Sequence, residues 1–244
     1  MRDYFNELTK QLTHLGRRHD LSRIFNDLLT IGVCSFHKTN IQSRLKEKDE
    51  SNEQLYLQTI KPYEKHEIEE LGKALGTIQL NILDNPYSDV LGEFFMQHIS
   101  KGQNGQYFTP EPICDFMAKI NLEGLKGEGN RVYDPACGSG RMLLSAAKIN
   151  HRNFFYGVDS AHSCAQMTAL NFFFNGLKCE VAWMNSLSNE WFGGWNINMD
   201  GLGIQPIQKD QSQIWREVPK AKTAEFETRS NSTPSNPSHQ LTLF

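Results

Sequence analysis

The sequence predicts an α/β fold, in which a helical N-terminal region precedes part of a doubly wound parallel sheet. Two observations support this. Up to about residue 120, apolar residues recur at spacings of three and four, which is typical of amphipathic helices. From residue 130, short apolar runs alternate with helical segments in a strand–helix–strand–helix–strand order.

The N-terminal helices are predicted from their apolar stripes and their caps. The stretch "DLSRIFNDLLTIGV" has Asp20 as its N-cap, and further stripes follow at 65–83 and 90–99. The stretch "TPEPICDFMAKI" begins with Thr109 as a cap and with prolines that a first turn tolerates. Its apolar residues, which we expect to pack in the core, are Ile113, Phe116, Met117 and Ile120.

Three parallel strands are predicted, at "RVYDP", "FFYGVD" and "CEVAWM". The helices between them are "MLLSAAKI" and "SCAQMTALNFFFN", and Gly176 ends the second. After residue 195 the alternation is weak, and "WNINMDG" predicts at most one extra edge strand. The polar stretch "NSTPSNPSHQ" predicts a disordered tail.

The composition limits the classes of function that this chain can have. The chain has 244 residues, 39% hydrophobic and 22% charged, with a formal net charge of −3, so no global basic field indicates nucleic acid. The short cluster of Arg17, Arg18 and Arg23 is compatible with phosphate contacts or with an ordinary solvated surface. Five scattered cysteines at no metal spacing indicate reduced thiols, and no apolar run reaches the length of a membrane helix. We therefore expect a cytoplasmic protein without metal or membrane.

The loop "DPACGSGRM" (134–142) is the strongest ligand-binding signal in the chain. Gly138 and Gly140 allow the backbone to pass close beneath a ligand, and Asp159 ends the next strand, where a carboxylate can accept both ribose hydroxyls of an adenosine. Leu143 stands where a dinucleotide fingerprint has its third small residue, which argues against NAD. No Lys-Ser/Thr follows the glycines, which excludes a Walker-type phosphate loop.

These residues resemble a known family. "DPACGSG" is similar to the first motif of S-adenosylmethionine-dependent methyltransferases, in the form found in adenine-specific (N-6) DNA methylases. "GQYFTPEPI", "DVLGEFF" and "LNFFFNGL" resemble segments of the modification (M) subunit of type I restriction–modification systems, and "MNSLS" stands where its third motif follows strand three. The resemblance implies a partial Rossmann-like methyltransferase sheet and adenine N-6 methylation of DNA.

The resemblance also implies a pocket for S-adenosyl-L-methionine. Asp159 would hold the ribose, and Asn185 stands where the family usually has an aspartate that contacts the adenine amine; the amide oxygen can still accept. The residues implied to cover the cofactor are Tyr107, Phe108, Thr109 and Pro110, and those implied to line its methionine and sulfonium side are Asp134, Ala136, Gly138, Ser139 and Gly140.

The family's Asn-Pro-Pro-aromatic acceptor loop does not occur in this sequence. The nearest string, "DNPYS" (84–88), lacks the second proline and is interpreted as a turn. Strands four to seven of the methyltransferase sheet have no sequence to form them, which predicts a truncated family member. The edge of the first strand is then paired by "WNINMDG", paired by a partner subunit, or left unpaired in a truncated chain. The catalytic residues stay unassigned, with Asn185 the weak candidate.

The last five residues, "QLTLF", resemble the peptide by which bacterial proteins dock on the DNA polymerase III sliding clamp. The resemblance implies that Gln240 anchors one pocket and that Leu241, Leu243 and Phe244 contact an apolar groove. The polar tether before them would order only on binding.

The sequence predicts four segments and leaves three alternative functions. We expect a helical region (1–100), a partial cofactor-binding domain (101–200), a flexible linker (201–239) and a clamp-binding peptide (240–244). The leading hypothesis is a DNA adenine methyltransferase that acts alone or with a partner. The alternatives are a catalytically silent binding protein recruited to the clamp, and a helical interaction module with a vestigial half-domain.

Overall fold

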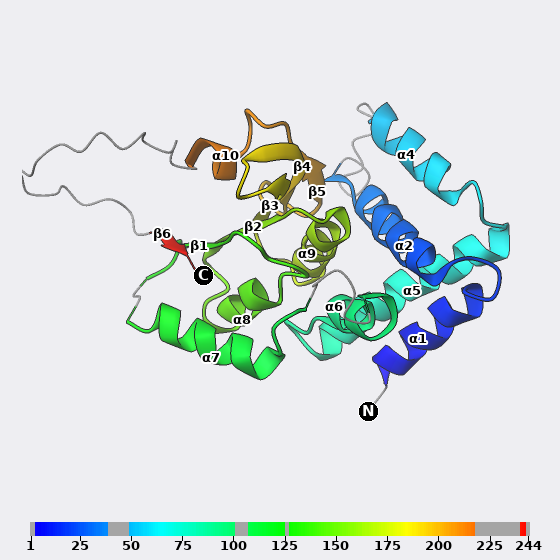
Figure 1. Ribbon diagram of the computed structural model, residues 1–244, viewed down its shortest axis with the longest axis horizontal. Helices are drawn as coiled ribbons and strands as arrows, with labels where there is room; N and C mark the ends of the chain where they lie inside the picture. Colours follow the sequence, from blue (N-terminus) through cyan, green and yellow to red (C-terminus); the bar gives the residue numbers. More distant parts are fainter. Residues whose placement is uncertain (1–2, 39–48, 101–106, 125–126, 218–239, 243–244) are drawn as a thin grey trace, which may run out of the picture.

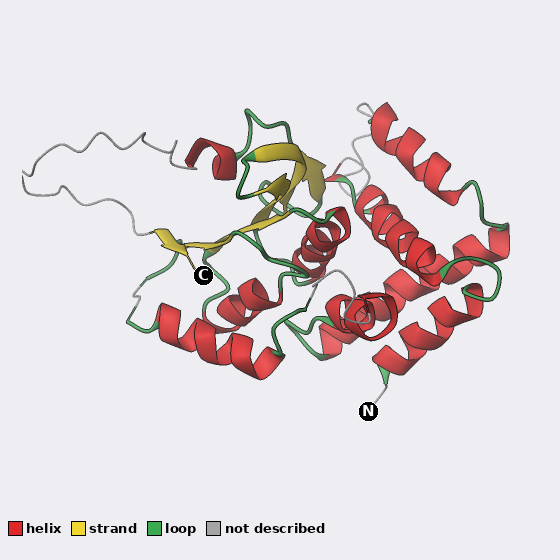
Figure 2. Cartoon of the chain, viewed as in Figure 1, coloured by secondary structure: helices red, strands yellow, loops and turns green. Residues whose placement is uncertain are grey.

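The computed structural model describes residues 3–38, 49–100, 107–124, 127–217 and 240–242, and it has the mixed α/β architecture that the sequence predicts (Figure 1). The helices of the N-terminal half gather on one side of the molecule, and on the other side the strands form one sheet with helices packed around it (Figure 2). A single cluster of buried apolar side chains runs from Leu8 in the first helix to Ile204 in the fifth strand. The helical region and the sheet therefore share a hydrophobic core.

The N-terminal half is helical, as the stripes predict. Asp20 caps α2, since its Oδ1 accepts from the backbone N–H of Arg23 at 2.9 Å. In space, α1 packs against α5 and α2 packs against α9, so the helical region lies directly on the sheet domain. The elements of this half are α1 (Tyr4–Leu15), α2 (Leu21–Ser35), α4 (Glu50–Ile60), α5 (Lys65–Asp84), α6 (Val90–Phe94), the π-helix η1 (Phe95–Ser100) and α7 (Glu111–Leu122).

The sheet has six strands in the order β5-β4-β3-β2-β1-β6. The three predicted strands are present, are parallel to one another and alternate with the two predicted helices. The elements of this half are β1 (Arg131–Asp134), α8 (Arg141–Ile149), β2 (Phe154–Asp159), α9 (His162–Phe174), β3 (Cys179–Asn185), β4 (Glu190–Ile197), β5 (Ile204–Pro206), α10 (Gln213–Glu217) and β6 (Gln240–Thr242).

The expectation of at most one strand after residue 195 was wrong. β4 pairs antiparallel with β3 from residue 190 onward, and β5 pairs antiparallel with β4. The alternation was hidden because β4 contains Gly193 and Gly194, and a Cβ on Gly194 would lie 2.8 Å from the carbonyl oxygen of Val181 on β3. Close backbone approach, which sequence patterning does not report, selects glycine there.

The apolar face predicted for α7 was also wrong. Ile113, Phe116 and Ile120 are 49%, 62% and 55% exposed, and Met117 is half-buried. The helix instead packs on α8 through Cys114, Ala118 and Leu122, which are buried. Small side chains let the two helices approach closely, so the larger residues face outward. The N-cap is Pro110 rather than Thr109, and no side chain caps this helix.

The two faces of the sheet are covered unequally. α7, α8 and α9 lie on one face (Figure 1), where Val132 and Phe155 join the main core. On the opposite face Tyr156, Val158 and Met184 pack with Ile214 of the short helix α10. Parallel sheets are normally buried on both faces. The second face is thus the less protected one within the described residues.

The edge of β1 is occupied by the backbone of β6, in the parallel register Arg131↔Gln240, Val132↔Leu241 and Tyr133↔Thr242. The candidate "WNINMDG" does not serve this edge, because it belongs to β4 and the turn after it, on the far side of β3. β5 and α10 lie within the range that the sequence assigns to a linker. Leu243, Phe244 and the tether 218–239 fall outside the described residues.

Candidate functional site

The glycine loop joins β1 to α8 and is held by two neighbouring elements. The backbone N–H of Cys137 donates to the carbonyl oxygen of Val158 on β2 at 2.8 Å, and the Thr168 hydroxyl of α9 donates to the carbonyl oxygen of Gly138 at 2.9 Å. Gly138 and Gly140 have φ values of 56° and 84°, in the left-handed region that favours glycine. The first turn of α8 therefore starts from a loop fixed by the sheet.

The segment 107–110 lies on this loop. A Cβ on Gly138 would lie 2.8 Å from Cε1 of Phe108, so the ring rests directly on bare backbone. The Phe108 ring in turn stacks on Phe95, with ring centroids 5.5 Å apart. Tyr107 beside it is 71% exposed. The structure thus brings together two motifs that are about 30 residues apart in the chain.

Two carboxylates end the adjacent strands β1 and β2. Asp134 is 2% exposed and accepts from the backbone N–H of Ala136 at 3.0 Å. Burial raises its pKa to about 6, and the nearby Asp159 adds to the rise. Asp159 accepts from the N–H groups of Gly138 at 2.9 Å and Ala161 at 2.8 Å, and burial raises its pKa too. Both side chains therefore shape the loop, Asp134 as a buried carboxyl group and Asp159 as a partly exposed one.

A pocket of about 160 Å³ opens between segment 107–109 and the loop. Pro110, Gly140 and Asp159 do not line it, although they lie next to it in the fold. Its volume is below the range of roughly 300–1,000 Å³ found for ligand pockets. The predicted residues that line it are Tyr107, Phe108, Thr109, Asp134, Ala136, Gly138 and Ser139, together with Cys114, Cys137, Arg141 and Met142.

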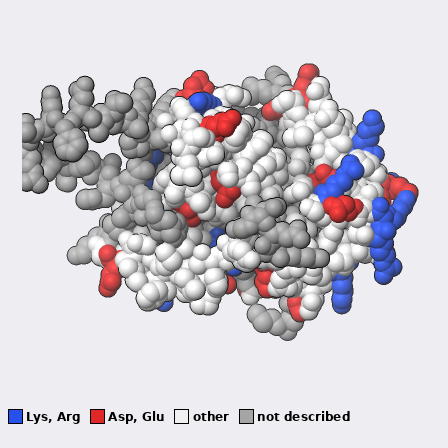
Figure 3. Space-filling view, viewed as in Figure 1, with Lys and Arg blue, Asp and Glu red and all other residues white. Residues whose placement is uncertain are grey.

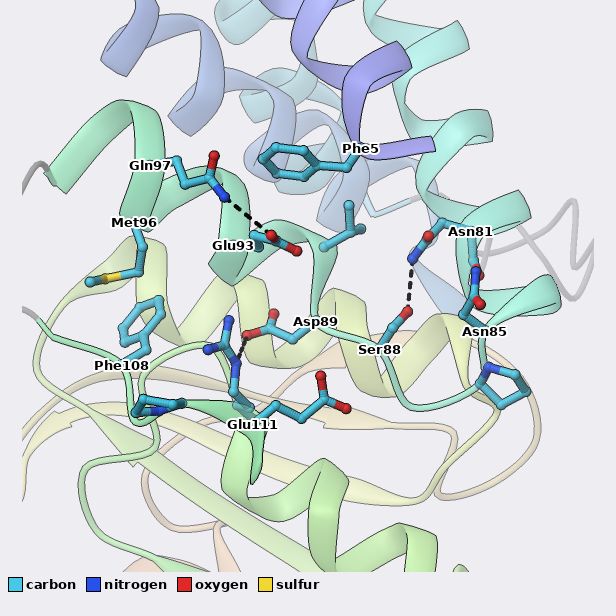
Figure 4. Close-up of a pocket in the computed structure, with 14 residues that line it drawn as sticks. Phe5, Asn81, Asn85, Ser88, Asp89, Glu93, Met96, Gln97, Phe108 and Glu111 are labelled. Atoms are coloured by element: carbon cyan, nitrogen blue, oxygen red, sulfur yellow. Dashed lines mark hydrogen bonds and ion pairs between the residues drawn. The ribbon is translucent and has the colours of Figure 1, made fainter. Parts of the chain in front are cut away.

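A larger pocket of about 780 Å³ adjoins the first one and shares Phe108 and Arg141 with it. Figure 4 shows residues that line it: Asn81 from α5 on one side, Gln97 on the other, and Phe5 from α1 and Glu93 between them. The Gln97 amide donates to Glu93 at 3.1 Å and the Asn81 amide donates to Ser88 at 2.7 Å. The N-terminal helices therefore build one wall of the region beside the glycine loop.

Sequence reasoning missed three residues that hold this region. Asp89 and Arg141 form an ion pair of 2.9 Å in the floor of the larger pocket, and Thr168 supports the loop from α9. The signals for them were present but weak: an acidic residue at the head of "DVLGEFF" and an arginine directly after Gly140. Asp89 and Arg141 lie about 50 positions apart in the chain, and sequence spacing does not reveal such a pair.

Asn185 ends β3, at the same carboxyl end of the parallel strands as Asp134 and Asp159. Its side-chain oxygen accepts from the backbone N–H groups of Leu187 at 3.0 Å and Ser188 at 3.1 Å. The oxygen that could accept from an adenine amine is therefore already engaged in its own turn. In "DNPYS", Asn85 and Ser88 close a turn before α6, as the sequence indicates.

The described part of the chain also bears on the expectations about metal and membrane. Within the described ranges, no group of three or more His, Cys, Asp or Glu side chains is placed to hold a metal ion. Among the helices that the structure describes, none has the length and apolar content that a membrane crossing requires.

Comparison with known proteins places this site in a family. The sequence model of the family described as N-6 DNA Methylase matches residues 82–240, more than half of the chain. The type I restriction enzyme MpnII methylase subunit of Mycoplasma pneumoniae is 30% identical over 115 residues, which is 43% of this chain and 21% of that protein. The chain thus matches about a fifth of the length of this curated relative.

Two solved structures are similar in part. The methyltransferase subunit of a type I restriction–modification system from Streptococcus thermophilus is 15% identical, with a TM-score of 0.38 over 71% of this chain and 56% of that one. A protein described as a class I S-adenosylmethionine-dependent methyltransferase from Listeria monocytogenes is 16% identical, with a TM-score of 0.40 over 76% of this chain and 53% of that one. Both TM-scores are below 0.5, so the assignment rests on the family match.

The family indicates S-adenosyl-L-methionine as the cofactor. The glycine loop and the overlying segment 107–110 both lie within the matched range. This chain belongs to the N-6 DNA methylase family.

Proposed function

We propose that the chain binds S-adenosyl-L-methionine at the glycine loop and serves in the methylation of adenine N-6 in DNA. The observation that carries the proposal is the contact of Phe108 with bare backbone at Gly138, because the ring occupies the space that any side chain there would need and so closes a backbone cradle beside the pocket. The buried carboxyl group of Asp134 lines the same pocket, and the partly exposed Asp159 accepts from the Gly138 N–H at 2.9 Å. The residues present therefore fit the cofactor.

Each residue has a chemical role in this proposal. When bound, the cofactor supplies an electrophilic methyl group on its sulfonium. Gly138 and Ser139 offer main chain along one side of the pocket, Phe108, which rests on Gly138, closes that side and excludes water, and Asp159 accepts from the ribose hydroxyls. The remaining predicted contacts are those of Tyr107, Thr109, Pro110, Asp134, Ala136 and Gly140. Because the pocket holds only about 160 Å³ and excludes Asp159, the adenosine end has to extend beyond it toward β2.

Calorimetry with S-adenosyl-L-methionine tests the cofactor site. Asp159→Ala should lower the affinity tenfold or more, since it removes two charge-assisted hydrogen bonds to the ribose. The matched control is Asp200→Ala, which removes an exposed carboxylate elsewhere. Absence of heat with the wild-type chain would overturn the cofactor proposal.

We propose that a partner subunit supplies the acceptor chemistry. The amine of adenine has to meet hydrogen-bond acceptors outside the base stack, and the Asn185 oxygen is engaged by its own turn. Two features support a partner. Within the described residues, the strand β6 covers the edge of β1 with three residues. The helix α7, which packs on α8, presents an exposed stripe of Ile113, Phe116 and Ile120.

Tritiated methyl transfer to adenine-containing DNA tests catalysis, first with the chain alone and then with a modification subunit from the same genome. We expect transfer only in the mixture. Phe116→Glu should abolish the mixed activity and the complex, whereas Leu202→Glu, which changes a similarly exposed residue on another face, should leave both intact. Cofactor binding without transfer in either sample would favour a catalytically silent binding protein.

Exposed cations at one edge support contact with DNA phosphates. Lys and Arg side chains gather where the ends of α1, α4 and α5 meet (Figure 3). Arg18, after α1, and Glu64, before α5, form an exposed ion pair of 2.7 Å in this region. Within the described residues Arg17, Lys61 and Lys65 are exposed and form no ion pair, so they are available to phosphate oxygens.

Fluorescence anisotropy with duplex DNA at several salt concentrations tests this surface. The double change Lys61→Glu/Lys65→Glu should weaken binding and reduce the salt slope by about 1 for each phosphate that the variant no longer neutralises. The control Lys119→Glu changes the charge on α7 instead. Equal slopes for the wild-type protein and the double variant would place the DNA elsewhere.

We also propose that Gln240, Leu241, Leu243 and Phe244 dock on the DNA polymerase III sliding clamp. The support is the resemblance of "QLTLF" to clamp-binding peptides and the long polar tether before it. Deleting residues 240–244 should abolish retention on immobilised clamp. Because the deletion also removes β6, the variant Leu243→Ala/Phe244→Ala, which keeps residues 240–242, should have the same effect. Unchanged retention of either variant on the immobilised clamp would contradict clamp docking. The division of the chain at residues 100, 200 and 239 stays a separate proposal, and β5 and α10 lie inside the range that it assigns to the linker.

A further inference from the structure

Asp89 is a buried carboxylate on which three parts of the fold converge. It is 8% exposed and caps α6, where its Oδ1 accepts from the backbone N–H of Gly92 at 2.8 Å. The same oxygen accepts from the Asn171 amide of α9 at 2.8 Å. Its Oδ2 accepts from the Ser139 hydroxyl at 2.5 Å and from Nε of Arg141 at 2.9 Å. Four donors therefore satisfy one carboxylate.

The partners of Asp89 continue to both sides of the cofactor pocket. Arg141 Nη1 donates to the carbonyl oxygen of Thr109 at 3.3 Å, on the overlying segment. The Asn171 amide also donates to the carbonyl oxygen of Ser139 at 2.9 Å, in the glycine loop. Asp89 thus connects the end of the helical region to the floor and to the cover of the same pocket.

Steric fit makes this arrangement specific. A Cβ on Gly92 would lie 2.1 Å from Asp89 Oδ2 and 2.4 Å from Ser139 Oγ. No side chain is compatible with those distances, so α6 must present a glycine to the carboxylate and to the loop. The turn of α6 and the glycine loop are packed against each other through Asp89.

Charge makes the arrangement sensitive to substitution. Burial raises the pKa of Asp89, while Arg141 and the hydroxyl of Ser139 oppose the rise. Removing one member of a buried pair leaves the other charge without compensation and is strongly destabilising. Replacement of the carboxylate by an amide would also turn an NH₂ group toward Ser139 or Arg141, which are themselves donors.

We propose that Asp89 is a positioning residue for the cofactor loop: it sets Ser139 and, through Arg141, Thr109, and so makes cofactor affinity depend on the helical region. The inference rests on the proposed cofactor site. Asp89 lines the larger pocket and not the small one between the loop and its cover. Its action on the cofactor is therefore indirect.

The test compares Asp89→Asn with Asp27→Asn in two measurements. Asp27 is a suitable control because it too accepts from a hydroxyl, that of Tyr63 at 2.7 Å, and pairs with an arginine, but it lies within the helical region. Hydrogen exchange of the amides at 136–140 is measured without cofactor, and calorimetry with S-adenosyl-L-methionine is measured on the same samples.

Asp89→Asn should speed exchange in the loop at least tenfold and weaken cofactor binding at least tenfold, whereas Asp27→Asn should change neither by more than twofold. If Asp89→Asn does not fold, Asn171→Leu replaces it, because that side chain lines neither of the two pockets and its amide donates to Asp89 and Ser139. Unchanged loop exchange overturns the inference. If exchange changes but the wild-type protein binds no cofactor, the cofactor proposal fails and the coupling stands.

Discussion

Gly138 and Phe108 lie so close that even a methyl group on the glycine would overlap the ring, with 2.8 Å between the added Cβ and Cε1 of Phe108. The two residues come from different motifs, and they meet only because segment 107–110 folds over the β1–α8 loop. The backbone at Gly138 is also in the left-handed region, with φ of 56°. Sterics and conformation thus both require glycine at this position.

Gly138→Ala should weaken S-adenosyl-L-methionine binding at least tenfold and lower the free energy of unfolding by about 1–2 kcal/mol, the cost of a left-handed non-glycine residue. Gly140→Ala should act similarly, because its Cβ would lie 3.0 Å from Cγ2 of Thr168 and φ is 84°. Calorimetry and urea unfolding measure the two effects. A cofactor affinity within twofold of the wild-type value for both variants would contradict the cradle.

Gly72→Ala and Gly76→Ala should have the opposite effect. Both glycines lie within α5, neither has a positive φ, and no atom outside the local helix lies within 4 Å of an added Cβ. Alanine has the higher helix propensity, so each change should raise the free energy of unfolding by about 0.5–1 kcal/mol. Urea unfolding measures it. A lower midpoint would show that α5 has a neighbour on that face.

Asp134 should make stability depend on pH. Burial raises its pKa to about 6 from 3.8, so between these pH values the folded state holds a proton that the unfolded state has released. Its contribution to stability is therefore present below about pH 4 and is lost as the pH rises through about 6. Asp134→Asn keeps an acceptor for the Ala136 N–H and removes this pH dependence.

The variant should consequently gain up to about 3 kcal/mol relative to the wild-type protein between about pH 4 and about pH 7.5, as roughly two pKa units of linkage allow. Urea unfolding at a series of pH values gives the difference directly, and other titrating groups cancel in it. Parallel stability curves for the two proteins would mean that Asp134 titrates normally.

Glu180 should hold α10 on the sheet. Its carboxylate is 1% exposed and accepts from the Ser212 hydroxyl at 2.5 Å and from the backbone N–H groups of Gln213 at 3.0 Å and Ile214 at 3.1 Å. Glu180→Gln replaces charge-assisted hydrogen bonds by neutral ones and should lower stability by about 1–3 kcal/mol.

Limited proteolysis provides the local readout for Glu180→Gln. Cleavage between residues 207 and 217 should be faster than in the wild-type protein, because the Glu180 carboxylate is the main polar anchor of α10. Glu190→Gln, at an exposed position at the start of β4, serves as the control. Equal cleavage rates for Glu180→Gln and the wild type would show that apolar packing of Ile214 suffices.

Much of the fold followed from local patterns. The helices of the first half, the cap at Asp20 and the alternation of β1, β2 and β3 with two helices were predicted correctly, because periodicity and caps are local properties. The motif at 134–140 and the segment at 107–110 could likewise be identified in the sequence, since each is contiguous. Where packing overrode pattern, prediction failed: α7 buries small residues and exposes Ile113 and Phe116, and β4 contains glycines that its neighbours require.

The sequence by itself determined the helical first half, the alternation of β1, β2 and β3 with two helices, the glycine loop and the carboxylates that end β1 and β2. Only the tertiary structure decided which residues meet around that loop: Phe108 over Gly138, Thr168 beneath it, and Asp89 between Ser139, Arg141 and Asn171. The physical reason is that a loop's conformation depends on donors and volumes supplied by distant segments. Such pairs are separated by about 30 to about 80 positions of chain, and no local periodicity encodes them.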